Sequence, residues 1–250
     1  MNGDVISLIK DGICTIEFYH PKGNSLPSTL LNQLAASISE AGNNDAVKVV
    51  VLKSGGEGAF CAGASFDELL AIENDTQAML FFRGFGKVIL AMKNCPKFIV
   101  GRVHGKAVGG GVGLIAACDY TIAAEQASVK LSELSLGFGP FVIAPAVRRK
   151  IGLAAFSALS LQPTQWKSAA WAHQHGLFSE VASDTATLNT AVQQLVEQMA
   201  GFSPNAMASI KETLWADFTD YGNSLDDHAR LSGNLSQSAF AQSVLKGFKK

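Results

Sequence analysis

The stretch AVGGGVGLIAACDY, residues 107–120, decides the fold of this chain. It places four glycines within the five positions 109–113 and then continues as an apolar run. A glycine inside a helix or strand costs roughly 0.5–1 kcal/mol relative to alanine, because it loses more backbone entropy on folding. A glycine run therefore indicates that another group approaches the main chain closely, or that φ must be positive.

The composition describes a globular protein with balanced charge. The chain has 250 residues, is 48% apolar and carries a formal net charge of -1. This suits one large domain, or one core with a small appendage. A net charge this close to zero predicts neither a nucleic-acid partner nor an anionic membrane partner. The longest apolar region, residues 98–118, is interrupted by Arg102, His104 and Lys106, so we expect no membrane span.

The four cysteines, Cys14, Cys61, Cys95 and Cys118, form no C-x-x-C pair and have apolar neighbours. This usage favours reduced thiols over a disulfide framework or a zinc site. The first residues, MNGDVISLIKDG, lack the charged start and long apolar run of a signal peptide. We therefore expect a cytoplasmic protein with no metal.

Hydrophobic periodicity predicts alternating strands and helices up to about residue 145, and mostly helices after it. DVISLIKDGICTIEF, residues 4–18, predicts two strands joined at Asp11-Gly12. Ser28 is the expected cap of the next helix. Ser203 and Pro204 predict another helix start, and residues 236–248 a last helix. The helical stripe of Phe81, Phe85, Val88 and Met92 is expected to be core rather than a ligand site.

Three kinds of site could explain the glycine run. A dinucleotide-binding turn could use Gly111, Gly113 and Ala116, but it needs an acid about 20 residues on, and Asp119 and Glu125 come too early. A P-loop is excluded because Lys106 precedes the glycines.

The third kind is an oxyanion hole, in which bare N–H groups from two loops converge on one carbonyl oxygen. A second glycine-rich loop is available for this: GGEGAFCAGASFDEL, residues 55–69. Like the first loop, it follows a predicted strand and leads into a predicted helix.

Three segments carry a resemblance to a known family. AFCAGASFDE, residues 59–68, resembles the AF-x-AGAD-x-x-E signature of the crotonase superfamily, the enoyl-CoA hydratase and isomerase family. VHGKAVGGGVGLIAACDYTIAAE, residues 103–125, resembles its (N/H)G-x-A-x-GGG-x-x-L-x-x-x-CD-x-x-x-A block. HPKGNSLPSTLLNQL, residues 20–34, is similar to its RP-x-x-NAL start. The order and spacing of the first two blocks make the resemblance specific.

The resemblance implies an α/β fold, the crotonase (ClpP-like) spiral of repeated ββα units with a helical C-terminal region. Residues 1–195 would form the spiral core, and residues 196–250 a helical region for trimerisation that also covers CoA. It further implies a homotrimer or a dimer of trimers. The local sequence signals by themselves support only an α/β fold with a helical tail.

The resemblance also implies an acyl-CoA thioester as substrate, with no further cofactor. Ala64 and Gly110 match the two residues whose N–H groups form the family's oxyanion hole. The positions that match its CoA-binding residues are Lys22, Asn24, Ser25, Leu26, Ala62, Ala64, Ser65, Phe66, Gly110, Phe240, Lys246 and Lys249. The last three fall where the family's C-terminal helix contacts CoA, often from a neighbouring subunit.

The acidic residues suggest which reaction occurs. Hydratases of the family use two glutamates, and the first position is Gly113 here, which leaves a gap there. The second matches Glu133 in LSELSLG, residues 131–137, with Ser132 in place of the usual proline. A lone carboxylate suits a proton shuttle that moves a double bond, as in Δ3-Δ2-enoyl-CoA isomerases. Nearby apolar residues, such as Leu131 and Phe138, could raise its pKa.

Two other functions stay open. A hydratase for a short-chain or methylglutaconyl-like substrate would need a further acid. The nearby acids are expected to be exposed residues at the start of a helix, where the helix dipole favours them. A catalytically silent subunit that binds CoA would also explain the missing acid. The side chains considered for further roles are Asp67, Glu68, Glu73, His228, Cys61, Arg83 and Lys87. We expect them to be surface residues or, for Cys61, core filler.

Overall fold

The structure is a computed structural model that describes residues 3–218 and 220–248. Its main sheet has six strands in the order β1-β2-β3-β4-β6-β9. β1 is antiparallel to β2, and the following strands are parallel to one another. A second sheet, β5-β7-β8, pairs β5 and β7 in parallel and β7 and β8 antiparallel.

The strands are short, and each parallel strand of the main sheet is followed by a helical segment further along the chain. Their bounds are β1 (Asp4–Lys10), β2 (Ile13–Tyr19), β3 (Val49–Ser54), β4 (Phe98–Val103), β5 (Ala107–Val108), β6 (Tyr120–Ala124), β7 (Ser128–Lys130), β8 (Lys167–Ser168) and β9 (Glu180–Ala182). The helices are α1 (Ser28–Asn43), α2 (Phe66–Leu70), α3 (Asp75–Asn94), α4 (Gly110–Ala117), α5 (Ala144–Leu161), α6 (Ala169–Gln174), α7 (Thr185–Ala200), α8 (Pro204–Leu214), α9 (Tyr221–Ser236) and α10 (Ala239–Lys246). One 3₁₀ turn, η1, spans Glu133–Leu136.

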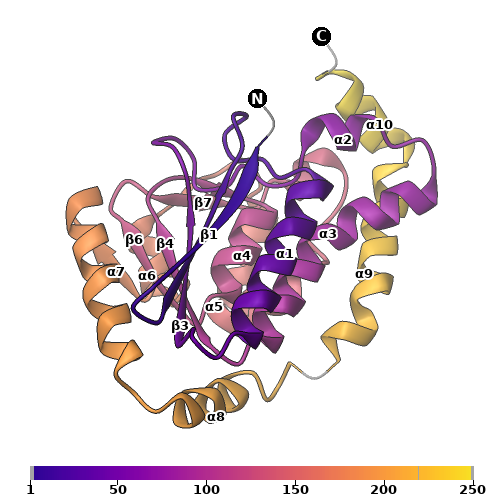
Figure 1. Cartoon of the computed structure of the whole chain (residues 1–250). Coiled ribbons are helices and arrows are strands. Elements are labelled where there is room, and N and C mark those ends of the chain that lie inside the picture. Colours follow the sequence, from indigo (N-terminus) through magenta and orange to yellow (C-terminus); the bar gives the residue numbers. More distant parts are fainter. Residues whose placement is uncertain (1–2, 219, 249–250) are drawn as a thin grey trace.

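The main sheet separates two apolar cores (Figure 1). On one face, Leu188, Val192 and Val196 of α7 pack against alternate side chains of the central strands, including Val51 and Val100. On the other face, α1, α3 and α4 cover the remaining side chains of the same strands in a larger core. The strands are buried on both faces, which explains their continuous apolar sequences.

The N-terminal hairpin forms as predicted. Asp11 and Gly12 both have positive φ, 51° and 80°, as a two-residue turn of type I′ requires. The expected cap of α1 is wrong, because Ser28 is the first residue of the helix and Pro27 is its N-cap. The Ser28 N–H and hydroxyl instead donate to Glu68 Oε2, at 2.9 and 2.8 Å.

The C-terminal helices surround the core. α8 lies beneath the sheet, α9 returns along α3, and α10 lies near α2 (Figure 1). The predicted cap at Ser203 is confirmed, since its Oγ accepts from the Ala206 N–H. The single helix expected over residues 236–248 is wrong: α9 ends at Ser236, and Ser238 caps a separate α10. The boundary expected after residue 195 falls within α7.

A buried ion pair holds α8 beneath the sheet. Lys211 Nζ lies 2.9 Å from Asp119 Oδ2, and both side chains are nearly inaccessible. Asp119 also accepts from the Ile99 N–H at 2.8 Å and from Trp215 Nε1 at 3.0 Å, and Lys211 donates to the Lys97 carbonyl. Since buried charges are tolerated only when paired and hydrogen-bonded, this network fixes the position of α8.

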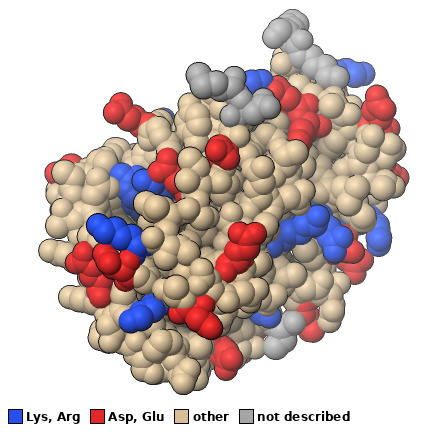
Figure 2. All heavy atoms as spheres, viewed as in Figure 1, with Lys and Arg blue, Asp and Glu red and all other residues tan. Residues whose placement is uncertain are grey.

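The surface carries both signs of charge. On the face that Figure 2 shows, Lys and Arg side chains are interspersed with Asp and Glu, with no large area of one sign. In the part of the chain that the structure describes, no helix combines the length and apolar character needed to cross a membrane.

Candidate active site

Two glycine-rich loops run side by side beyond the carboxyl ends of β3 and β4. A parallel bridge joins Cys61 to Ala107: the Val108 N–H donates to the Cys61 carbonyl at 2.9 Å, and the Cys61 N–H to the Lys106 carbonyl at 3.2 Å. The close contact depends on glycine, because a Cβ on Gly111 would lie 2.7 Å from the Cys61 carbonyl oxygen. The glycine run thus lets two segments of the main chain approach each other closely.

The first loop presents the N–H of Ala64 to a cavity. Ala64 forms a parallel bridge with Leu26, in which the Leu26 N–H donates to the Gly63 carbonyl and the Ser65 N–H donates to the Leu26 carbonyl. In such a bridge the middle residue turns its own N–H away from the partner strand. No group within residues 3–218 and 220–248 accepts a hydrogen bond from the Ala64 N–H.

The second loop presents the N–H of Gly110. Gly110 is the first residue of α4, where an N–H has no partner within the helix. Like that of Ala64, this N–H donates to no group of the described chain. The two loops meet here, since a Cβ on Gly63 would lie 3.9 Å from the Gly110 nitrogen. Ala64 and Gly110 both line the same cavity, so their N–H groups can serve one acceptor.

The carboxyl group of Glu133 lies beside these amides. A Cβ on Gly109 would lie 2.9 Å from Glu133 Oε1, and the φ of +54° at Gly109 also favours glycine. Glu133 Oε2 is buried and has no hydrogen-bond partner within the described residues. Burial raises the pKa of Glu133 to about 7, although its own backbone N–H opposes this shift. A carboxyl group with this pKa can accept and return protons near neutral pH.

The cavity has a volume of about 340 Å³ and is mostly apolar and aromatic. Phe82 of α3 contacts Phe81 and Phe138 edge-to-face, each pair at 5.1 Å between ring centroids. Its lining includes Ala64, Phe66, Phe81, Phe82, Phe85, Gly110, Glu133, Phe138, Ile143, Ser232 and Phe248. Phe81 and Phe85 therefore belong to the core and also line the cavity. The sequence-based expectation that this helical stripe is core rather than a ligand site is therefore incomplete.

Ile143 occupies the space next to Gly113. A Cβ on Gly113 would lie 2.6 Å from Ile143 Cγ2 and 3.3 Å from Ile89 Cδ1. The gap expected at Gly113 is therefore absent, since an apolar side chain fills it. Among the described residues that line the cavity, Glu133 is the one acid.

The other acids considered from the sequence have structural partners or face solvent. Asp67 pairs with Lys22 on the surface. Glu68 accepts two hydrogen bonds from Ser28 at the start of α1. Glu73 is exposed. None of the three acids lines the cavity, so the structure offers no second acid from this group.

The remaining candidates also lie outside the cavity lining. Burial raises the pKa of Cys61 to about 12, which leaves it a protonated core thiol. Lys87 faces solvent as expected, but Arg83 pairs with Asp226 of α9 at 2.8 Å, so it is not a free surface cation. His228, also on α9, is half-buried, and its Nδ1 has no partner among the described residues.

The structure places the expected CoA-binding residues in three groups. Ala62, Ala64, Phe66 and Gly110 line the cavity. A second group lies in the loops around the cavity. Asn24 Nδ2 donates to the carbonyls of Gly55 and Ala59, and Ser65 Oγ caps α2. In the same group Leu26 is buried, Ser25 is half-buried and Lys22 is exposed. Phe240 and Lys246 are exposed on α10 and do not line the cavity, and Lys249 lies outside the described residues.

Sequence reasoning did not find Phe248 and Ser232, which reach the cavity from the C-terminal part of the chain. Phe248, after α10, lines it and contacts Phe66 edge-to-face at 5.1 Å. The C-terminal end of this chain therefore covers its own cavity. Ser232 of α9 lines the cavity from a buried position. Neither has a local motif, although α9 and α10 show the amphipathic periodicity of helices that pack on a core. Among the described residues, no group of His, Cys, Asp and Glu could hold a metal ion.

Comparison with known proteins identifies similar chains. The family model described as Enoyl-CoA hydratase/isomerase matches residues 8–249. A "Probable enoyl-CoA hydratase" of Bacillus subtilis (strain 168) is 30% identical, over 98% of this chain and 95% of the relative. The peroxisomal "Delta(3,5)-Delta(2,4)-dienoyl-CoA isomerase" of Arabidopsis thaliana is 26% identical, over 76% and 72% of the two chains.

The fold also matches solved structures. A putative enoyl-CoA hydratase from Mycobacterium avium paratuberculosis K-10 superposes with a TM-score of 0.87 at 26% identity, over 98% of this chain and 95% of that one. This match confirms the fold that the glycine-rich blocks predict.

Proposed function

The chain belongs to the enoyl-CoA hydratase/isomerase family, and we propose that within this family it moves a carbon–carbon double bond of an acyl-CoA thioester. It is an enzyme of the hydratase or isomerase type. The observation that carries the isomerase proposal is the arrangement of acids: the buried Oε2 of Glu133 lies beside two unpaired amides, while Ile143 fills the space next to Gly113.

In the proposed mechanism the thioester oxygen accepts hydrogen bonds from the N–H groups of Ala64 and Gly110. These bonds stabilise the enolate that forms when a proton leaves C2. Each such donor is typically worth about 2.7–4 kcal/mol of transition-state stabilisation.

Glu133 moves the proton. Its carboxylate removes a proton from C2 of a 3-enoyl-CoA, and the electron pair delocalises over the thioester and the double bond. The resulting carboxylic acid then returns the proton to C4, so the double bond lies between C2 and C3. No water is consumed, and one carboxyl group is sufficient. The raised pKa of Glu133 suits both halves of this transfer.

Hydration is the second candidate, favoured by the hydratase names of relatives. It needs one group to activate water and another to deliver a proton. The apolar contact between Ile143 and Gly113 argues against a second acid at that place. The third hypothesis, a silent CoA-binding subunit, does not explain a buried carboxyl group beside two free amides.

The first experiment follows a 3-enoyl-CoA by the ultraviolet absorbance of the conjugated product. We expect turnover by the wild type, and a loss of at least about 10²-fold in kcat for Glu133→Gln, because the amide cannot take the proton. Glu125→Gln changes an exposed acid that does not line the cavity and should leave kcat unchanged. Wild-type protein that binds CoA without turning over any enoyl-CoA would favour the silent subunit.

The second experiment separates isomerase from hydratase. The enzyme is incubated with a 2-enoyl-CoA in ¹⁸O-labelled water, and the products are analysed by mass spectrometry. We expect no labelled 3-hydroxyacyl-CoA. Its accumulation in amounts that depend on enzyme concentration would replace the isomerase proposal with hydration.

A further inference from the structure

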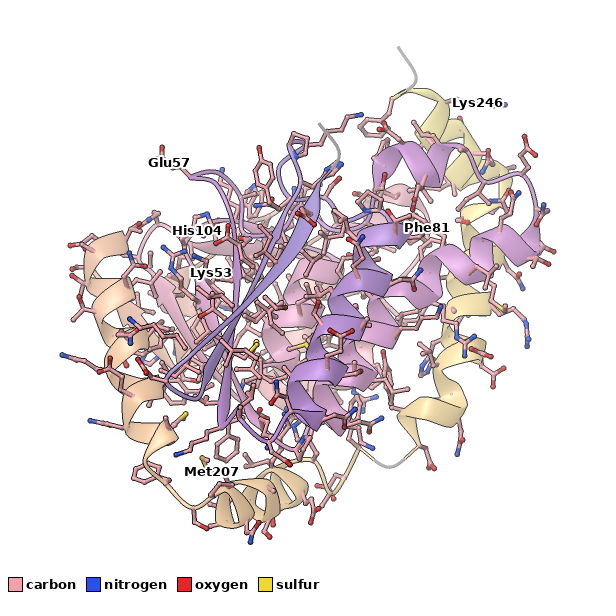
Figure 3. All side chains as sticks on the ribbon, viewed as in Figure 1. Lys53, Glu57, Phe81, His104, Met207 and Lys246 are labelled. Carbon is pink, nitrogen blue, oxygen red and sulfur yellow. The ribbon has the colours of Figure 1, made fainter. Side chains whose placement is uncertain are left out.

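A polar groove of about 410 Å³ lies on the face of the main sheet that α7 covers. We call it the α7 groove, and its polar lining includes Glu17, Lys53, Arg102 and Asn189. It shares no lining residue with the catalytic cavity. Figure 3 shows this separation: the labels place Lys53 and His104 on one side of the sheet and Phe81 of the cavity on the other.

The groove exists because the apolar contact between α7 and the sheet stops short of the carboxyl ends of the strands. Val51 and Val192 are the last apolar pair, and both line the groove. Beyond them, β2, β3 and β4 present Glu17, Lys53 and Arg102 to the same face. These side chains are polar, so they leave an opening that water or a ligand can fill.

The charges in the α7 groove do not cancel. Lys53 Nζ pairs with Glu17 Oε2 at 2.6 Å. Arg102 lies directly opposite Lys53 in the register of β3 and β4, and it pairs with no carboxylate of the described residues. Two cations therefore face one carboxylate, and the groove has an excess of one positive charge.

The guanidinium of Arg102 is held in place by neutral groups. Its Nε donates to Asn189 Oδ1 at 2.7 Å, and its Nη1 lies 3.1 Å from His104 Nδ1. Burial, and then the charges of Arg102 and Lys53, keep the pKa of His104 below its ordinary value, so the ring stays neutral and accepts this hydrogen bond. Nη2 forms no hydrogen bond within residues 3–218 and 220–248, so it can donate to a ligand.

We propose that the α7 groove binds a small oxyanion, the carboxylate or phosphate group of a metabolite, through Arg102 and Lys53. The two N–H groups of Arg102 Nη2 and the ammonium of Lys53 can donate to separate oxygens of the ligand, because a carboxylate and a phosphate each offer at least two. The ligand would neutralise the excess positive charge. Gly55 and Gly56, which begin the loop that leads to Ala64, also line the groove and would contact the ligand.

Calorimetric titration of the full chain with two probes, inorganic phosphate and succinate, tests the proposal and tells phosphate from carboxylate. We expect saturable binding of at least one probe with a Kd of about 1 mM or lower. Arg102→Gln should weaken binding at least about tenfold. Glu17→Gln should tighten it, because the variant removes the carboxylate that competes for Lys53. Arg230→Gln, on an exposed part of α9, should match the wild type.

A saturating concentration of an enoyl thioester of N-acetylcysteamine, which carries no oxyanion, should leave the binding of the probe unchanged, because the catalytic cavity is a separate site. Absence of saturable binding for both probes, wild-type affinity in Arg102→Gln, or displacement by the uncharged thioester would each overturn the proposal. If Arg102→Gln does not fold, Arg102→Lys keeps the charge and removes the Nη2 donors. Unchanged affinity in that variant would also contradict the inference.

Discussion

At the scale of single residues, the buried Oε2 of Glu133 has a consequence for pH dependence. The carboxyl group has a pKa of about 7 in the folded protein against an ordinary value of 4.5. As a base, Glu133 must be ionised, so we expect kcat/KM for a 3-enoyl-CoA to rise with pH and to reach half its maximum near pH 7. Rates measured between pH 5 and 9 check this. A flat profile over that range contradicts the assignment.

The raised pKa of Glu133 also predicts that the stability of the protein falls as pH rises, whereas its activity increases. Between about pH 4.5 and 7 the folded protein binds more protons at Glu133 than the unfolded chain does, so the free energy of unfolding should fall as pH rises through this window. Glu133→Gln cannot titrate and should remove that part of the pH dependence. Urea unfolding of both proteins at pH 4.5, 6 and 7.5 measures the difference.

The contact between Gly113 and Ile143 predicts the result of rebuilding a second acid. Gly113→Glu alone should destabilise the protein by roughly 1–3 kcal/mol, because its Cβ would overlap Ile143. The double variant Gly113→Glu with Ile143→Ala has room for the side chain and should regain part of this loss. We expect the double variant to gain hydratase activity with a 2-enoyl-CoA. Equal stability of the single variant and the wild type would show that Ile143 moves aside freely.

Residues whose role depends on the main chain could be located from the sequence. Ala64 and Gly110 follow from the resemblance of the two glycine-rich blocks to the family's motifs, and the structure brings both to one cavity. Ile143 and Phe248 could not be located, because each reaches the site through a contact between distant segments that leaves no local pattern. The same is true of the groove residues Arg102 and Asn189.

At the scale of elements, the ion pair between Lys211 and Asp119 makes α8 sensitive to one substitution. Lys211→Met would leave Asp119 charged, buried and without its main partner. We expect the free energy of unfolding to fall by about 3–5 kcal/mol. Lys87→Met, at an exposed position of α3, should change it by less than about 0.5 kcal/mol. A small effect of Lys211→Met in chemical denaturation would contradict the structural role of the pair.

The elements themselves were predictable where the signal is local. The hairpin at Asp11-Gly12 and the cap at Ser203 are set by neighbouring residues, and both form as expected. The cap predicted at Ser28 is wrong, because the Ser28 hydroxyl donates to the carboxylate of Glu68, 40 residues away. The break between α9 and α10 was missed because both sides of it continue an amphipathic helical pattern.

At the scale of the whole molecule, the resemblance to the family predicts assembly. Large apolar side chains remain exposed, including Leu153 and Leu161 of α5 and Phe202, which follows α7. Scattered exposure of this kind is common, but a subunit interface would bury part of it. We expect sedimentation equilibrium to give a mass three times the 26.3 kDa of one chain, or a multiple of that trimer. A mass of 26.3 kDa at micromolar concentration would contradict this expectation.

The position of Phe248 has a practical consequence for anyone who prepares this enzyme. Its ring contacts Phe66 and helps to enclose the space around Glu133. A purification tag or fusion partner attached close to Phe248 would therefore adjoin the cavity lining. Kinetic constants from such material would describe an altered cavity, so tags belong away from this residue.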